Sequence, residues 1–332
     1  MRKTLAAMLI LVPAWLLAGE QRSDNAFLNV LWLVHSFGSA ESADPAHDVQ
    51  TKAEIVAALR ISRNLTQQTT ERLMAPETYA RLAGDDGELD PVEVQKHLES
   101  QVPETRKALF PALALHAKLL TTGFDQIGEA HRDPLKELLD WIVENYESGK
   151  PLSIVFVCTG NSRRSILGAT MGNVAAGYYG LPEVRCYSGG TRPTAFNDRT
   201  AATLREIGVQ VEATGEKAES GGDSSNAIYK VRWGEGVAGS PQQALEFSKR
   251  FDDTHNPRKG FAAIMVCSEA DASCPSVPGA AIRIAMPYVD PKVYDDTEIE
   301  SRKYAERRDD IGRAMLAVMM QARLRLVSAG RL

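Results

Sequence analysis

The chain has 332 residues, of which 44% are hydrophobic and 24% are charged, and its formal net charge is -5 at pH 7. This length is typical of two domains, and the composition is that of a globular protein, which excludes the disordered and fibrous classes. The small acidic excess gives no reason to expect a nucleic acid as a partner. Four cysteines are too few for a disulfide scaffold, so we expect them to serve chemistry instead.

The first residues predict export. Residues 1–3 form a basic start, and residues 4–18 form an apolar stretch that is interrupted at Pro13. This pattern is typical of a secretory signal peptide, because the apolar run is too short to span a bilayer, and we assign it to residues 1–19. The expected location is the periplasm or envelope. Two alternatives stay open: an uncleaved anchor, or a start codon placed too early, in which case the protein is cytoplasmic.

The next part of the chain carries no recognisable chemistry. Apolar residues recur at helical spacing over residues 20–112, which we interpret as a helical spacer or interaction region. Residues 113–150 form a helical lead-in, with helices expected at 113–120 and 133–146. The remaining residues, 151–328, are expected to form the catalytic domain.

The catalytic half alternates between strand and helix patterns. Strands are expected at 153–157, 183–188, 261–267 and 281–286, helices at 165–179, 197–207, 241–251 and 298–326, and a hairpin arm at 228–233 after a polar insert at 215–225. Such alternation predicts an α/β fold with an open, mainly parallel four-stranded sheet and helices on both faces. Ligands of open sheets bind at the carboxyl ends of the strands, where Cys158, Ser188 and Cys267 fall.

The first of these strands runs into Cys158-Thr-Gly-Asn-Ser-Arg-Arg-Ser165 and then into a helix. Backbone N–H groups at a helix N-terminus point at one spot and favour an anion there. Arg164 adds a planar, two-pronged donor that matches a tetrahedral oxyanion, and the same positive field favours the reactive thiolate of Cys158. We therefore predict that Cys158 is a nucleophile and that the oxyanion is bound by Thr159, Gly160, Asn161, Ser162, Arg163, Arg164 and Ser165.

Three residues of this loop have expected roles in its geometry. Gly160 lets the backbone come close to a ligand. Asn161 tolerates a left-handed backbone and can fix the loop with its amide. Ser165 can form a hydrogen bond with the sulfur of Cys158. The competing interpretation is a buried core cysteine beside a solvated basic turn.

The run from Cys158 to Ser165 resembles the oxyanion loop of the low-molecular-weight protein tyrosine phosphatases. It resembles still more that of their relatives, the thioredoxin-coupled arsenate reductases. Some bacterial members also carry a helical lead-in similar to residues 124–127 here, so the resemblance covers roughly residues 113–325. It implies the low-molecular-weight phosphatase fold and cysteine chemistry on an oxyanion.

A second motif, Cys267-Ser-Glu-Ala-Asp-Ala-Ser-Cys274-Pro, resembles the relay cysteines of those reductases. The resemblance implies that Cys158 attacks arsenate, that Cys267 then attacks Cys158 and releases arsenite, and that Cys274 carries the disulfide to a thioredoxin-like reductant. The segment between the two cysteines must move for both sulfurs to meet. The alternative is a static disulfide or a pair of packed thiols.

Asp290 is the expected general acid. Hydrolysis of a phosphate ester by a cysteine requires an acid for the leaving group, and the resembling phosphatases use an Asp-Pro loop late in the chain, matched here by Asp290-Pro291. The alternative is an ordinary turn aspartate. The phosphatases often place an aromatic residue after this pair, whereas Lys292 stands there, which argues against a phosphotyrosine substrate.

No metal or other cofactor is expected. Some arsenate reductases hold a cation through an acidic residue eleven positions after the nucleophile, and Ala169 occupies that position here. None of the six histidines has the spacing of metal ligands. The remaining cysteine, Cys186, lies within an expected strand and is interpreted as a core residue.

Three functions of different classes follow. The first is arsenate reduction through Cys158, Cys267 and Cys274. The second is a low-molecular-weight phosphatase that uses Cys158, Arg164 and Asp290 on phosphotyrosine or aryl phosphates. The third is an envelope module that binds oxyanions or senses redox state with little turnover. The relay cysteines favour the first, because a plain phosphatase does not need them.

Overall fold

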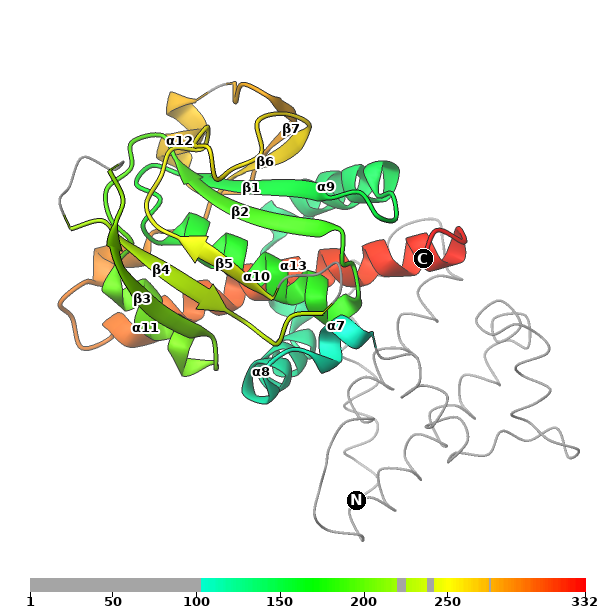
Figure 1. Ribbon diagram of the computed structural model, residues 1–332, viewed down its shortest axis with the longest axis horizontal. Helices are drawn as coiled ribbons and strands as arrows, with labels where there is room; N and C mark the ends of the chain where they lie inside the picture. The colour runs from blue at the N-terminus through cyan, green and yellow to red at the C-terminus, as the bar shows by residue number, and fades with distance from the viewer. Residues whose placement is uncertain (1–102, 220–224, 238–241, 275) are drawn as a thin grey trace, which may run out of the picture. The chain divides into compact units, whose positions relative to one another are not determined.

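The computed structural model describes residues 103–219, 225–237, 242–274 and 276–332 (Figure 1). Of these, Pro103–Leu332 forms one compact unit. The predicted signal peptide at 1–19 and nearly all of the predicted helical region at 20–112 lie outside the described residues and stay predictions. Among the helices that are described, none is long and apolar enough to cross a membrane.

A four-stranded sheet forms the centre of this unit. Its strands are β2 (Val184–Gly190), β1 (Leu152–Cys158), β6 (Phe261–Met265) and β7 (Ala280–Ala285), in that order across the sheet, and neighbouring strands are parallel. The inner strands β1 and β6 are apolar and almost wholly buried, as expected for a parallel sheet between other layers. The predicted fold class, an open α/β sheet flanked by helices, is confirmed.

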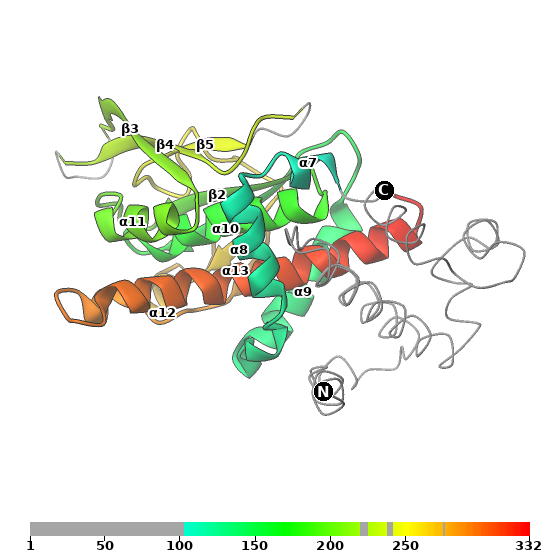
Figure 2. The ribbon, with the colours of Figure 1, turned by 90° about the horizontal axis from the view of Figure 1, so that it is seen from below.

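Helix α10 (Arg164–Tyr179) packs directly on β1 and β2, and all of its residues are buried. Two glycines allow this close approach. A Cβ atom at Gly168 would lie 2.4 Å from the ring of Phe156, and one at Gly172 would lie 2.7 Å from the sulfur of Cys186. The long helix α13 (Glu300–Ser328) runs alongside α10 (Figure 2).

Shorter helices complete the unit. Helices α8 (Pro111–Thr121), α9 (Arg132–Asn145) and α11 (Asp198–Glu206) pack on α13, and α9 also contacts β7. The lead-in therefore belongs to the same core as the catalytic half. The remaining helical segments are α7 (Glu104–Lys107), η2 (Phe124–Gln126), η3 (Glu129–His131), α12 (Ser268–Ser273) and η4 (Pro291–Tyr294).

The segment after α11 differs from its prediction. It forms a three-stranded antiparallel sheet of β3 (Gln210–Lys217), β4 (Ala227–Arg232) and β5 (Gln243–Glu246). The helix predicted at 241–251 is wrong, because Gln243–Glu246 pairs with β4 instead. The Gln, Ala, Leu and Glu residues there are good helix formers, and strand pairing overrides that weak local preference.

Candidate active site

The oxyanion loop, residues 158–165, joins the end of β1 to the start of α10. Cys158 is the last residue of β1 and is only 4% exposed. Its Sγ atom lies 3.1 Å from the hydroxyl of Ser165. The first amides of a helix have no partner within the helix, so those of α10 are available to an anion beside the thiol.

Asn161 holds the loop in shape from within. Its φ angle is 42°, in the left-handed region, and its side chain is fully buried. Its amide nitrogen donates to the hydroxyl of Ser165 at 2.9 Å, and its amide oxygen accepts from the backbone N–H of Lys249 at 2.8 Å. The expected role of Asn161 is therefore visible in the structure, and the amide links Cys158, through Ser165, to a distant part of the chain.

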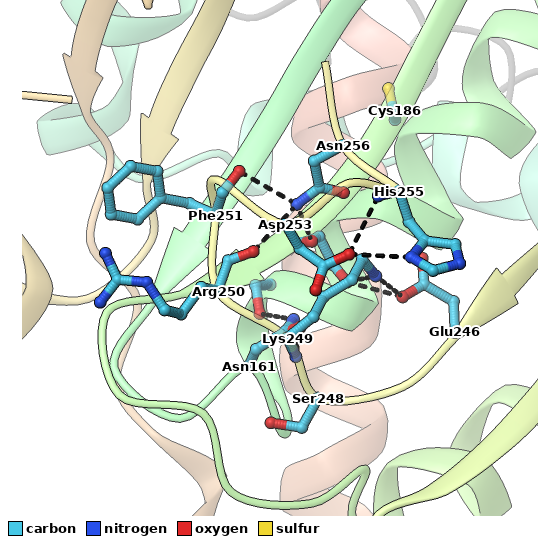
Figure 3. A network of polar contacts seen from close by, with 12 residues as sticks. Asn161, Cys186, Glu246, Ser248, Lys249, Arg250, Phe251, Asp253, His255 and Asn256 are labelled. Carbon is cyan, nitrogen blue, oxygen red and sulfur yellow. Dashed lines mark hydrogen bonds and ion pairs between the residues drawn. The ribbon is translucent and has the colours of Figure 1, made fainter. Parts of the chain in front are cut away.

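Support from outside the loop comes from residues 246–249, at the end of β5 and just after it. The hydroxyl of Ser248 donates to the carbonyl of Gly160 at 2.7 Å. Beneath it lies a buried ion pair, in which Nζ of Lys249 is 3.1 Å from Oε2 of Glu246 (Figure 3). The hydroxyl of Ser188 donates to the same oxygen at 2.6 Å. The two charged residues are only 2% and 3% exposed, so each needs the other to stay buried.

These supporting residues were missed from the sequence. Glu246 and Lys249 are ordinary surface residues by composition, and the strand-and-loop segment that carries them had been interpreted as a helix. The end of β2 also contributes, because a Cβ atom at Gly190 would lie 2.8 Å from the carbonyl of Thr159 and 2.9 Å from the nitrogen of Asn161. The Gly189-Gly190 pair is the one local signal that the chain packs tightly there.

Arg164 is paired with Asp290, the residue that the sequence predicts as the general acid. The guanidinium donates to Oδ2 of Asp290 at 2.6 Å and to the carbonyl of Tyr288 at 2.9 Å. The carboxylate of Glu269 lies farther away, at 3.9 Å. The Nε atom of Arg164 is buried and has no hydrogen-bond partner in the described part of the chain. A buried donor without a partner is costly, and a bound oxyanion would satisfy it.

The guanidinium of the neighbouring Arg163 is engaged elsewhere. It donates to the hydroxyl of Tyr304 at 2.6 Å and to Asp295 at 3.0 Å. Tyr304 in turn donates to Asp295 at 2.8 Å, and burial raises the pKa of Tyr304 to about 12, which keeps that hydroxyl protonated. Of the two loop arginines, Arg164 is therefore the one whose side chain is placed for an oxyanion, and Arg163 fixes the loop to α13.

Cys267 lies against the oxyanion loop. It is fully buried and caps the N-terminus of α12, where its Sγ atom accepts from the N–H of Ala270 at 3.3 Å. The hydroxyl of Thr159 is 3.5 Å from the same sulfur. Burial raises the pKa of the Cys267 thiol, and the Thr159 hydroxyl, the Ala270 amide and the charge of Arg164 partly oppose that rise. The Cys267 thiol thus lies beside the oxyanion loop, at Thr159.

Cys274 stands at the other end of α12 and is half-buried, with its thiol donating to the carbonyl of Ser276 at 3.2 Å. The helix between the two cysteines advances by about 1.5 Å per residue, which separates their Cα atoms by about 10 Å. Disulfides require Cα atoms within about 7 Å. All four cysteines are free, and bonding of Cys267 to Cys274 requires α12 to change shape.

The remaining predictions for this region concern Cys186 and metal ions. Burial raises the pKa of the Cys186 thiol, and the side chain packs against Gly172 inside the core, in keeping with its interpretation as a core residue. Ala169 is fully buried on α10. Among the residues that the structure describes, no group of three or more His, Cys, Asp or Glu side chains could hold a metal ion.

Comparison with known proteins agrees with this site. Residues 153–222, which contain the oxyanion loop, match the family model of the low molecular weight phosphotyrosine protein phosphatases. No curated protein sequence matches the chain. Among solved structures, the thioredoxin-dependent arsenate reductase Cg_ArsC1' of Corynebacterium glutamicum is 16% identical, with a TM-score of 0.29 over 74% of this chain and 98% of the other. The match to the family model confirms the resemblance to the low-molecular-weight phosphatases for residues 153–222.

Proposed function

We propose that this protein is an arsenate reductase that works through a relay of three cysteines. One observation carries the proposal: Cys267 is buried against the oxyanion loop beside Thr159, at the start of a short helix that ends in Cys274. Hydrolysis of a phosphate ester makes no use of a second and third thiol. A reductase needs the second thiol, because Cys158 and Cys267 together supply the two electrons that pass to arsenate, and the third thiol passes the disulfide on from Cys267.

In the first step the Cys158 thiolate attacks the arsenic atom of arsenate. The oxyanion displaces the carboxylate of Asp290 from Arg164, whose Nε atom then gains a partner. Asp290, released but close, takes up a proton from solvent and passes it to the departing hydroxyl of arsenate, so that water leaves and a sulfur–arsenic bond forms. The amides of the loop and the first turn of α10 stabilise the charge on the remaining oxygens.

In the second step the Cys267 thiolate attacks Sγ of Cys158. A sulfur–sulfur bond forms, the sulfur–arsenic bond breaks with its electron pair on arsenic, and arsenite leaves. Cys274 then attacks Cys267, which regenerates the Cys158 thiolate and leaves a Cys267–Cys274 disulfide. A thioredoxin-like dithiol returns two electrons to that disulfide. If the protein is exported, as the sequence predicts, a dithiol of the envelope must fill this role.

The second candidate is phosphatase activity on aryl phosphates. It is favoured by the match to the phosphatase family model and by the placement of Asp290 on Arg164. This reaction uses the same nucleophile and acid, with water in place of Cys267 in the second step. Lys292, next to Pro291, does not offer the aromatic surface that a phenol ring would favour.

Paired assays on the full chain test the proposal. Arsenate turnover with a thioredoxin system and hydrolysis of an aryl phosphate are measured for wild type, Cys158→Ser and Cys267→Ser. We expect Cys158→Ser to abolish both activities, and Cys267→Ser to abolish only arsenate reduction. Hydrolysis by wild type without any arsenate turnover would instead identify a phosphatase and leave the relay without a function.

A further inference from the structure

The last turn of α12 is fastened to the central sheet by Arg283. This residue lies on β7, and its guanidinium makes three hydrogen bonds to the segment between the two relay cysteines. It donates to the carboxylate of Asp271 at 2.6 Å, to the carbonyl of Asp271 at 2.8 Å and to the carbonyl of Cys274 at 3.0 Å. The last carbonyls of a helix lack hydrogen-bond partners within the helix, and here Arg283 donates the missing hydrogen bonds.

These contacts belong to the helical form of the segment. Cys267 is fully buried at the end of β6, so the approach of the two sulfurs requires Cys274 to move toward it. Movement of Cys274 displaces the carbonyl that Arg283 holds and unwinds the turn that contains Asp271. The three hydrogen bonds therefore stabilise the dithiol and are lost or weakened in the disulfide.

We propose that Arg283 is a positioning residue that sets the reduction potential of the Cys267–Cys274 pair by holding α12 in its reduced, helical form. This inference rests on the proposed function, because it assumes that the pair forms a disulfide. Stabilising the dithiol makes a couple a stronger oxidant. The disulfide that ends the relay is then readily reduced by an incoming dithiol, which returns the enzyme to its starting state.

The positive charge of Arg283 could also change the reduction potential of the cysteine pair without any hydrogen bond, and a second cation nearby tests for such an effect. Arg283 is a cation, and so is Arg250, which lies close enough to Cys274 for an electrostatic interaction and is paired with Asp252 at 2.9 Å. In the described part of the chain, the Arg250 guanidinium donates to Asp252 and not to α12. Replacing Arg283 by lysine keeps the charge but removes the fork of donors that spans the two carbonyls. Variants at Arg283 and Arg250 therefore distinguish the effect of the hydrogen bonds to α12 from the effect of a nearby positive charge.

The experiment measures the redox equilibrium of the pair in the full chain carrying Cys158→Ser, which isolates Cys267 and Cys274. Protein is equilibrated with reduced and oxidised glutathione at a series of ratios, free thiols are alkylated, and the disulfide fraction is read by mass spectrometry. Each disulfide formed converts one oxidised glutathione into two reduced ones. The variants compared are Arg283→Gln, Arg283→Lys, Arg250→Gln and Asp271→Asn.

We expect the equilibrium constant for disulfide formation to rise about tenfold in both Arg283 variants, which is about 30 mV toward more negative potential. Asp271→Asn should shift it in the same direction by less, and Arg250→Gln should leave it within about twofold. If Arg283→Gln fails to fold, Arg283→Lys carries the test. Potentials equal to wild type in both Arg283 variants, or a shift in Arg250→Gln with none in Arg283→Lys, overturn the inference but leave the relay intact. Failure of the wild-type pair to oxidise at any ratio overturns the relay as well.

Discussion

The oxyanion loop and helix α12 lie next to each other and are held in opposite ways. The loop is fixed from several directions, by Asn161 within it, by the segment that follows β5 and by the close approach of Gly190. Among the α12 side chains whose burial the structure describes, Ala270 is buried and Glu269 is exposed, and the last turn is held by Arg283 of β7. An anion site gains from donors that are in place before the substrate arrives. A relay gains from a segment that opens at little cost.

Breaking the buried ion pair beneath the loop should have the largest effect. Lys249→Met leaves Glu246 charged and unpaired, so we expect a loss of about 3–5 kcal/mol in the free energy of unfolding, measured by denaturant titration. The double variant Lys249→Met with Glu246→Gln should recover most of it.

The matched control is the neighbouring exposed pair. Arg250→Gln removes a cation from a pair whose side chains are 55% and 47% exposed, and it should change stability by less than about 1 kcal/mol. A loss in Lys249→Met no larger than that of the control would show that the pair does not support the loop.

Replacing Arg164 should have the next largest effect, on activity. A lysine cannot present two parallel donors to an oxyanion or satisfy the position of Nε, so kcat/KM should fall about 100- to 1000-fold for arsenate reduction and aryl phosphate hydrolysis alike. Arg163→Lys is the control, since its guanidinium contacts Tyr304 and Asp295 instead. Equal losses in the two variants would contradict the assignment of Arg164 as the oxyanion ligand.

The parts of the site that the sequence predicts are those formed by residues close together in the chain. Cys158, the loop and Arg164 are recognisable because a strand, a turn and a helix carry the whole arrangement within a few residues. Asp290 is predicted only through the resemblance, and its contact with Arg164 was not predicted. The Lys249 contacts were not predictable, because they join residues 61 and 88 positions apart. Local propensity predicts a helix for their segment, because its pairing with β4 is not visible in the local sequence.

Arsenate reduction and aryl phosphate hydrolysis should depend on pH in different ways, because only the first uses Cys267. Burial raises the pKa of the Cys267 thiol, so below that pKa its reactive thiolate fraction rises about tenfold per pH unit. If attack by Cys267 limits arsenite release, the single-turnover rate should rise about tenfold for each pH unit between pH 6 and pH 8. Aryl phosphate hydrolysis does not use Cys267 and should lack this rise. The same rise in a Cys267→Ser variant's hydrolysis would assign it to another group.

The smallest expected effect concerns the contact between Thr159 of the loop and Cys267, which caps α12. The Thr159 hydroxyl lies 3.5 Å from Sγ of Cys267 and helps to lower the pKa of that thiol. Thr159→Val removes the hydroxyl and keeps the shape, so arsenite release at neutral pH should slow by about 2- to 5-fold, the value of one weak hydrogen bond. Hydrolysis of aryl phosphate, which does not use Cys267, should change less. Equal slowing of both reactions would mean that the Thr159 hydroxyl stabilises the oxyanion loop and does not activate Cys267. The loop and the relay cysteines would then be coupled through the motion of α12.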